Sequence, residues 1–231
     1  MSSKKKIKVG KLILYVVLSF GAIVMVLPFI WTVLSSLKNM GQTFAYPVKI
    51  FPDPVVWENY PESLSALPFG RAYWNSFYIA AIVVIFQLLT ATMAGYSFAK
   101  LKFRGHGVIF VLFLATMMVP SQVTMIPLFL IMEKIGLLGS HMSLILPAAL
   151  FNAFGVFLMR QFIAGLPDEL EEAAIIDGAS VPQIFFRIII PLVKPSMAAF
   201  GIFVFLGQWN SFMYPLIFLN KTETFTVPLL L

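Results

Sequence analysis

The chain has 231 residues, of which 60% are hydrophobic and only 11% are charged, with a formal net charge of +6 and no cysteine. Soluble domains carry about 25% charged residues, so this composition excludes an ordinary soluble domain and predicts an integral membrane protein. A sequence without cysteine also excludes a disulfide framework and a thiolate metal site.

Five apolar segments are long enough to cross a bilayer, since a helix needs roughly 20 residues to traverse about 30 Å of hydrocarbon. Within their limits the sequence has no Asp, Glu, Lys or Arg. The predicted spans are approximately 12–34, 75–99, 108–132, 142–159 and 197–219. The predicted fold class is therefore an all-α integral membrane protein, a bundle of transmembrane helices that forms one domain over residues 1–231.

A cluster of lysines before the first span resembles the basic start of a signal peptide: Lys4, Lys5, Lys6, Lys8 and Lys11. The apolar run that follows is too long for a cleaved signal, and no small-x-small cleavage site comes before Ser35. We therefore expect an uncleaved membrane anchor.

The segment 36–73 between the first two spans is rich in proline and aromatic residues. Each proline removes a backbone donor and restricts the residue before it, so a long helix is not expected here. One interpretation is a compact loop at the membrane interface, with Trp57 and Tyr60 as headgroup anchors. The alternative is a docking surface for an external protein.

The distribution of basic residues predicts the orientation. With a cytoplasmic N-terminus, eleven of the 16 basic residues lie inside, as the positive-inside rule requires. The inner group is Lys4, Lys5, Lys6, Lys8, Lys11, Lys100, Lys102, Arg104, Arg160, Arg187 and Lys194, and the outer group is Lys38, Lys49, Arg71, Lys134 and Lys221. This asymmetry accounts for the net charge, so no nucleic-acid partner needs to be invoked.

The segment 166–195 is a polar island that this orientation places in the cytoplasm. Pro167 suits the start of a helix, and the acidic residues at 168–172 suit the positive end of its dipole. Gly178 stands where a left-handed C-cap would end that helix. Ser180 and Gln183 have the spacing of a capping box for a second helix, which we expect to end at Pro191. The product is a helix–turn–helix elbow.

The pattern E-A-A, three residues, G, nine residues, I-x-hydrophobic-P resembles the signature of membrane subunits of bacterial ATP-binding cassette importers, with Ile190 where Leu is commoner. The resemblance implies a coupling helix in a groove of the ATPase subunit. The implied ATPase-coupling residues are Glu172, Ala173, Ala174, Asp177, Gly178, Ile188 and Pro191.

Further motifs are similar to the second, maltose-type permease of carbohydrate importers: residues 27–31, 36–38, 75–76, 94–100, 103–105, 209–210, 212 and 215–216. This resemblance implies a bacterial cytoplasmic membrane protein with an ATPase subunit dimer, a second permease and an extracytoplasmic sugar-binding protein as partners. The family normally has six spans, so five imply a chain truncated after residues 225–231, which look like the approach to a sixth helix.

Uncharged polar residues inside the spans are candidates for a sugar path, but we favour the interpretation that they form hydrogen bonds between helices. The path candidates are Asn152, Trp209 and Asn210, with Gln87, Thr90, Thr92, Gln122 and Gln208 as further polar groups. His106 and His141 lie far apart in the sequence, and we expect each to be structural, because a zinc site usually needs three or four ligands.

We predict no enzymatic activity, cofactor or metal site in this chain. It lacks the phosphate-binding motif G-x-x-x-x-G-K-[ST], so we expect a separate subunit to bind and hydrolyse ATP. Three alternatives remain open. A secondary transporter would usually need ionisable groups within its spans, and a membrane hydrolase would need a catalytic His, Asp or Glu there. An importer for a non-sugar solute is the third alternative.

Overall fold

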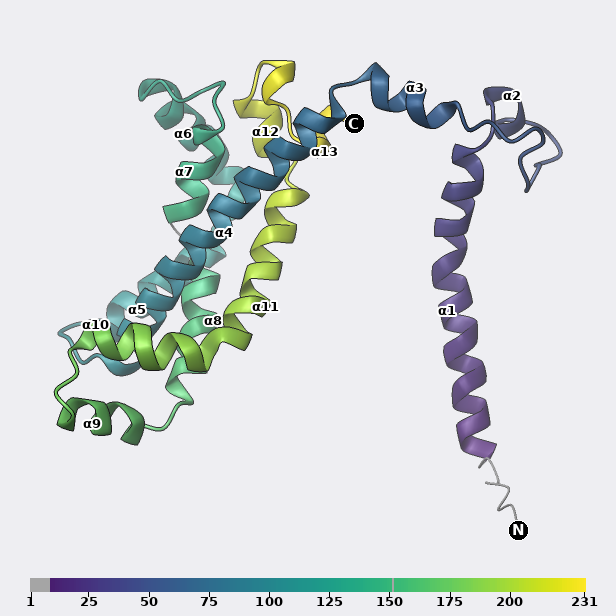
Figure 1. The fold of residues 1–231 in the computed structure, drawn as a ribbon. Coiled ribbons are helices and arrows are strands. Elements are labelled where there is room, and N and C mark those ends of the chain that lie inside the picture. Colours follow the sequence, from purple (N-terminus) through teal and green to yellow (C-terminus); the bar gives the residue numbers. More distant parts are fainter. Residues whose placement is uncertain (1–8, 151) are drawn as a thin grey trace, which may run out of the picture. The chain divides into compact units, whose positions relative to one another are not determined.

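The computed structural model describes residues 9–150 and 152–231, and these described ranges contain helices and no β-strand (Figure 1). The chain divides into two compact units, residues 1–67 and 68–231. Of the basic residues before the first span, Lys4, Lys5, Lys6 and Lys8 lie outside the described residues.

The first unit contains one long apolar helix, α1 (Val9–Ser36), and two short ones, α2 (Met40–Thr43) and α3 (Asn59–Ala66). None of the most apolar stretch of α1 is buried within the protein, which suits contact with lipid. The Asn59 amide donates to the carbonyls of Ser36 and Lys38, at 2.9 Å each, and so joins α3 to the end of α1. The proline-rich segment therefore forms short helices tied to the anchor.

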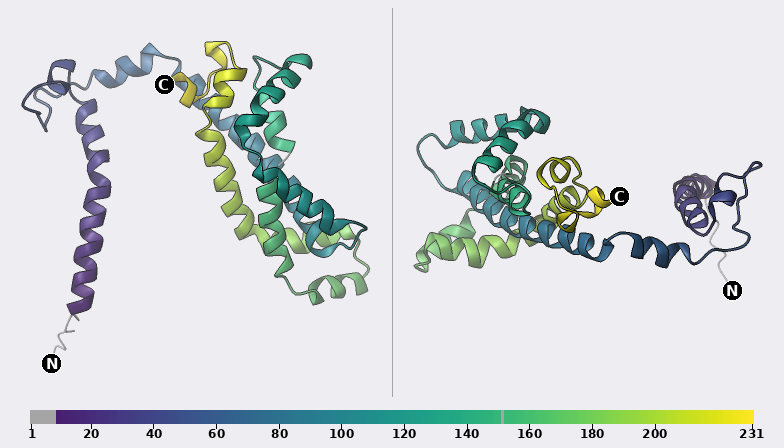
Figure 2. Two further views of the ribbon diagram at one scale, coloured as in Figure 1. Left: turned by 180° about the vertical axis from the view of Figure 1, so that it is seen from behind. Right: turned by 90° about the horizontal axis from the view of Figure 1, so that it is seen from above.

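The second unit is built around α4 (Phe69–Lys100), which packs against α7 (Met142–Leu150), α8 (Ala153–Ala164) and α11 (Ile190–Trp209) (Figure 1, Figure 2). The remaining helices are α5 (His106–Ala115), η1 (Thr116–Met118), α6 (Ser121–Lys134), α9 (Glu169–Ile176), α10 (Val181–Ile184), η2 (Phe185–Ile189), α12 (Met213–Phe218), η3 (Thr222–Thr224) and α13 (Val227–Leu230). Figure 1 shows α9 and α10 at one end of this unit and α6, α12 and α13 at the other.

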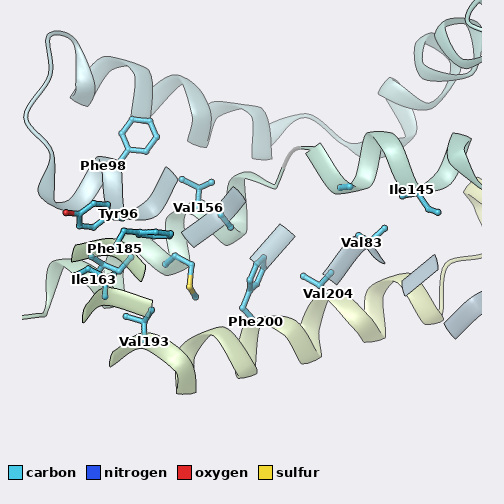
Figure 3. Close-up of a cluster of buried hydrophobic side chains, with 14 of the residues drawn as sticks. Val83, Tyr96, Phe98, Ile145, Val156, Ile163, Phe185, Val193, Phe200 and Val204 are labelled. Carbon is cyan, nitrogen blue, oxygen red and sulfur yellow. The ribbon is translucent and has the colours of Figure 1, made fainter. Parts of the chain in front are cut away.

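Two glycines allow the central helices to approach closely. A Cβ on Gly95 of α4 would lie 2.7 Å from the Cβ of Met159, and one on Gly155 of α8 would lie 2.2 Å from the ring of Phe200. Small residues at helix contacts are the usual means of close packing in membrane bundles. Around these contacts lies the apolar core, in which Met159 and Phe200 are almost fully buried (Figure 3).

Four helical stretches are long and apolar enough to span a membrane: Gly10–Ser36, Phe69–Lys100, Met142–Ala164 and Val181–Trp209. A fifth results if the pair His106–Met118 and Ser121–Lys134, bent by 97°, counts as one span. The predicted all-α membrane fold is confirmed. The segment 108–132 differs from the straight span expected, because it breaks before Pro120, whose ring restricts the preceding residue.

The fourth and fifth segments also differ in detail from the sequence-based limits. Between α7 and α8, Asn152 is extended and caps α8 through a 2.8 Å hydrogen bond from Gly155 N. The second elbow helix does not end at Pro191. It continues through η2, a π-helical turn, into α11 without a break, so Pro191 lies inside the continuous helical stretch Val181–Trp209. α11 then ends at Trp209, short of the predicted limit at residue 219.

Candidate functional site

The turn between α9 and α10 is the helix–turn–helix elbow expected from the sequence. Gly178 has φ +81°, and no atom lies within 4 Å of where its Cβ would be. Its N–H bonds Ile175 O at 3.0 Å, and Ala179 N bonds Ala174 O at 2.9 Å. These two bonds form a Schellman motif, which ends a helix and requires a left-handed residue, so the predicted C-cap is confirmed.

The second half of the elbow begins with the predicted capping box. The Gln183 side chain accepts hydrogen bonds from the Ser180 backbone N–H at 2.7 Å and from the Ser180 hydroxyl at 3.0 Å. Because α10 runs on through η2 into α11, the second half of the elbow belongs to the same helical stretch as a candidate membrane span. Figure 1 shows this helix lying across the end of the unit before it turns along α4.

The first half of the elbow is attached to the end of α4 by polar contacts. The buried Lys100 ammonium donates to Leu166 O at 2.7 Å, forms an ion pair with Asp168, and lies 3.9 Å from the Glu171 carboxylate. The Tyr96 hydroxyl donates to the same carboxylate at 3.1 Å. The hydrogen bond and the charge of Lys100 lower the pKa of Asp168 below its ordinary value. One end of α9 is thus fixed to α4.

The motif residues of the elbow face in two directions. Ala174 packs in the core and Ile188 is half-buried, so these two join the elbow to the bundle. The others are exposed: Glu172, Ala173, Asp177, Gly178 and Pro191. The resemblance implied that both alanines of the motif couple to a partner, but Ala174 is already covered by the protein itself.

The elbow also exposes large apolar side chains beside these motif residues. Ile176 is 85% exposed, and Ile175 is 61% exposed. Phe185 packs on Tyr96 with ring centres 5.6 Å apart, whereas its neighbour Phe186 remains exposed. We call Leu170, Ile175, Ile176, Val181 and Phe186 the apolar elbow residues. Exposed apolar side chains of this number on one polar island are typical of a binding surface.

The polar candidates inside the spans divide between cavity walls and local contacts. The Gln87 amide donates to Ala148 O at 2.6 Å and accepts from Asn152 at 2.6 Å, which joins α4 to α7 and to the start of α8. Gln87, Asn152 and Gln208 line a cavity of about 200 Å³, and Gln87 and Gln208 also line a second one of about 400 Å³. These three candidates are brought together.

The other candidates are not gathered there. Thr90 and Thr92 bond carbonyls of their own helix, and Gln122 is exposed. Trp209 stacks on Phe205 at 5.6 Å, and the Asn210 amide donates to Leu206 O at 2.8 Å, which caps the end of α11.

The two histidines have different surroundings. His141 contacts the Tyr78 hydroxyl through Nδ1, and its Nε2 lies 2.7 Å from Thr224 O, so His141 connects α4 to η3. His106 packs edge-on against Phe103, with ring centres 5.8 Å apart.

Sequence reasoning missed Tyr96, Lys100 and Glu171 as residues that hold the elbow. The signal was present, because Tyr96 and Lys100 are four positions apart and therefore share a helix face. It was not decisive, since only the folded chain shows that α9 lies against that face.

A bundle of long apolar helices with a capped elbow at one end defines a multi-pass membrane protein. Residues 87–230 match the family described as "Binding-protein-dependent transport system inner membrane component". The match covers more than half of the chain, and the chain belongs to this family. It is therefore a membrane component of a transport system that depends on a binding protein.

Relatives in other organisms support the same assignment. The chain is 34% identical over 217 residues to the arabinooligosaccharides transport system permease protein of Halalkalibacterium halodurans, with 91% of this chain and 76% of the relative covered. It is 34% identical over 215 residues to the lactose transport system permease protein of Rhizobium radiobacter, covering 93% and 78% respectively.

A solved structure is similar over almost the whole chain. It is the crystal structure of a bacterial ABC transporter involved in the import of the acidic polysaccharide alginate, with a TM-score of 0.83 and 27% identity. The alignment covers 99% of this chain and 80% of that chain. The resemblance to importer permeases inferred from the elbow motif is confirmed.

Proposed function

We propose that this chain is a permease subunit of a bacterial ATP-binding cassette importer for a sugar or oligosaccharide, and that its elbow is the docking surface for an ATPase subunit. The observation that carries the proposal is the elbow itself. It exposes apolar side chains, it is fixed to α4 through Lys100, and it continues into α11. A force applied there has a direct structural route into two spans.

The orientation supports this assignment of the elbow. A cytoplasmic N-terminus places the elbow on the side where ATP is available and places most basic residues inside. The energy then comes from the partner, since the sequence has no phosphate-binding motif of its own. Two further partners complete the proposed system: a second, different permease subunit and an extracytoplasmic sugar-binding protein.

Sugar is the proposed substrate class because both relatives described above carry saccharide names, and the solved structure comes from a polysaccharide importer. The neutral polar groups that line the cavities, such as Gln87 and Gln208, suit hydroxyl groups. A non-sugar solute is the competing reading, and an uptake assay with a panel of labelled solutes separates the two.

The docking claim is tested with Ile176→Asn, which removes an apolar side chain that the fold does not bury. We expect normal membrane abundance, at least tenfold less ATPase subunit retained on purification, and loss of uptake. Glu169→Gln, an exposed position on the same helix, is the matched control and should retain the ATPase. Full retention and uptake in Ile176→Asn would refute docking at this surface.

The shape of the elbow is tested with Gly178→Val. Valine is strained at φ +81°, so we expect insertion to proceed while ATP hydrolysis no longer drives uptake. Gly165→Val is the control, because Gly165 has an ordinary backbone conformation and only ordinary contacts at its Cβ position. Normal uptake by Gly178→Val at normal abundance would contradict the coupling role.

A further inference from the structure

The first unit is built in the opposite way from a water-soluble domain. Among its described residues, 9–67, only Lys38 and Gln42 are buried, and both are polar. The large apolar side chains of the loop after α1 are exposed instead. A chain surrounded by water buries its apolar groups, since their burial is the main driving force of folding. The reversed pattern indicates surroundings less polar than water.

The two buried side chains hold the loop after α1 together. The Lys38 ammonium donates to Lys49 O at 2.6 Å and lies 4.5 Å from the centre of the Trp31 ring. The Gln42 amide donates to Pro54 O at 3.3 Å. Both side chains therefore use their polar groups to fold the loop on itself and on the end of α1.

The contact with Trp31 shows in which direction the loop runs. Trp31 lies five residues before the end of α1 at Ser36, about 7.5 Å at 1.5 Å per residue. Because the same ammonium also contacts Lys49, the loop turns back along α1 instead of extending away from it. Figure 1 and Figure 2 show the chain after α2 bending back beside the end of α1.

The length of α1 indicates the depth at which this loop lies. α1 has 28 residues and is about 42 Å long, whereas the hydrocarbon core of a bilayer is about 30 Å thick and the bilayer with its headgroups about 40–45 Å. The ends of α1 therefore reach the headgroup layers. A loop that turns back beside one end lies in the same layer.

The backbone of the loop fits this depth and no greater one. In residues 46–51, no backbone N–H group bonds to another described residue. Such groups need water or lipid headgroups, which the hydrocarbon core does not supply.

The exposed side chains of the loop have the character of a membrane interface. We call Phe44, Tyr46, Val48, Ile50 and Phe51 the apolar tip. All five are exposed, Tyr46 by 98% and Phe51 by 72%. Aromatic side chains concentrate where hydrocarbon meets water. Lys49, the only charged residue between Phe44 and Phe51, can extend its ammonium toward lipid phosphates.

The aromatic pair expected from the sequence as headgroup anchors lies at the same end of α1. The Tyr60 and Ser36 hydroxyls share a hydrogen bond of 2.7 Å, and Trp57 lies near Tyr60, with ring centres 6.4 Å apart. Both rings are exposed. They add a second group of aromatic side chains close to the last residue of the span.

We propose that the loop 37–56 is an interfacial anchor, which inserts its apolar tip among the lipid headgroups and the first acyl carbons and so fixes the depth of α1. The partner is the lipid surface itself. An external protein, the alternative expected from the sequence, would leave the apolar tip in water whenever it dissociated, whereas lipid covers it throughout. The inference depends on neither the transported solute nor the ATPase.

Spin-label depth measurements on the full chain test this anchor, in nanodiscs of phosphatidylcholine and phosphatidylglycerol. The sequence has no cysteine, so Val48→Cys provides a single labelling site that the fold does not bury. Oxygen dissolves in lipid and a nickel chelate in water, and we expect a severalfold higher oxygen-to-nickel collision ratio at residue 48 than at Glu62→Cys. Glu62 is exposed on α3 and serves as the aqueous control, and Val24→Cys in α1 marks the hydrocarbon core.

Two outcomes of this measurement overturn the proposal. A label at residue 48 that meets the nickel chelate as readily as the label at residue 62 places the apolar tip in water, free to bind an external protein. A label at residue 48 that is shielded from both reagents means that a second copy of the chain covers the tip.

A second experiment asks whether the apolar tip holds the loop at this depth. Phe51→Glu replaces an exposed apolar side chain with a charged one, which lipid disfavours. With the label kept at residue 48, we expect the collision ratio to fall toward that of the aqueous control. Glu58→Gln, exposed and outside the apolar tip, should leave the ratio unchanged. A ratio in Phe51→Glu equal to that in Glu58→Gln would overturn the role of the tip.

Discussion

Gly95→Ala tests the closest contact between spans in the second unit. The added Cβ would lie 2.7 Å from Met159 Cβ, 2.9 Å from Arg160 N and 3.1 Å from Met159 C. Two of these three atoms are backbone and the third is a Cβ, so no side-chain rotation relieves the clash. Carbon atoms prefer separations of about 3.5–4.0 Å, and α4 and α8 must therefore move apart by about 1 Å.

The free energy of this change has two opposing parts. Overpacking costs about 1–3 kcal/mol, and backbone contacts belong at the upper end of that range. Alanine in place of glycine gains about 1 kcal/mol of helix propensity. We therefore expect a net destabilisation of about 1–2 kcal/mol, accompanied by looser packing around the buried Met159.

Gly201→Ala is the matched control, because the same chemical change has a different environment there. A Cβ on Gly201 would meet Leu88 and Val84 at 3.6 Å, which is ordinary contact. Only the propensity gain remains, so this variant should be as stable as the wild type or more so. Unfolding by denaturant in mixed micelles measures both. If Gly95→Ala proves as stable as Gly201→Ala, the assignment of close α4–α8 packing is wrong.

Three further predictions concern the polar contacts. Lys100→Met removes the charged hydrogen bond to Leu166 O and should cost about 1.5–3 kcal/mol, measured as faster hydrogen exchange over residues 166–176. Lys194 is exposed, so Lys194→Met should leave the hydrogen exchange of that segment unchanged. The pKa of Asp168 is lowered, so its contact with Lys100 stabilises the fold fully above the ordinary pKa of 3.8 and is lost as the pH falls through the lowered pKa. Hydrogen exchange over residues 166–176 should therefore become faster in acid, and Asp168→Asn should abolish this acid dependence. Asn75→Ala loses the hydrogen bonds from the Asn75 amide to Glu223 O and Phe225 O, at 3.0 and 2.9 Å, which should cost about 2 kcal/mol and speed hydrogen exchange over residues 222–226. Asn210→Ala is the control, because the Asn210 amide bonds Leu206 O of its own helix. Unchanged hydrogen exchange over residues 222–226 in Asn75→Ala would contradict the role of Asn75.

The elbow was predictable because its determinants are local. A glycine followed by Ser-x-x-Gln specifies a left-handed stop and a capped restart within six residues, and both are present in the structure. Hydropathy indicated where the apolar helical segments lie, though not where they end or break, because it is a property of composition over about 20 residues. These features need no knowledge of what lies across the bundle.

Continuity of the spans was not predictable in the same way. Pro120 lies at the break between η1 and α6, whereas Pro127 lies inside α6 and Pro195 inside α11, so proline alone did not decide where helices break. Neighbouring helices decide whether a freed carbonyl can be satisfied within a bundle. The π-helical turn at Phe185–Ile189 belongs to the same class, since it places Phe185 and Ile189 in the core and is selected by packing rather than by local sequence.

The elbow is joined to its two spans by bonds of different strength. Its α10 end continues as one helical stretch through η2 into α11, so a displacement of that end is transmitted to α11. Its α9 end is joined to α4 by Lys100 and Tyr96, through an ion pair and hydrogen bonds, which can open without unwinding a helix. In the proposed mechanism a displaced elbow therefore moves α11 in every cycle, whereas it moves α4 only while the Lys100 contacts hold. Since the larger cavity has walls from both helices, a difference between their movements changes its width, and the contacts of Lys100 set how large that difference becomes.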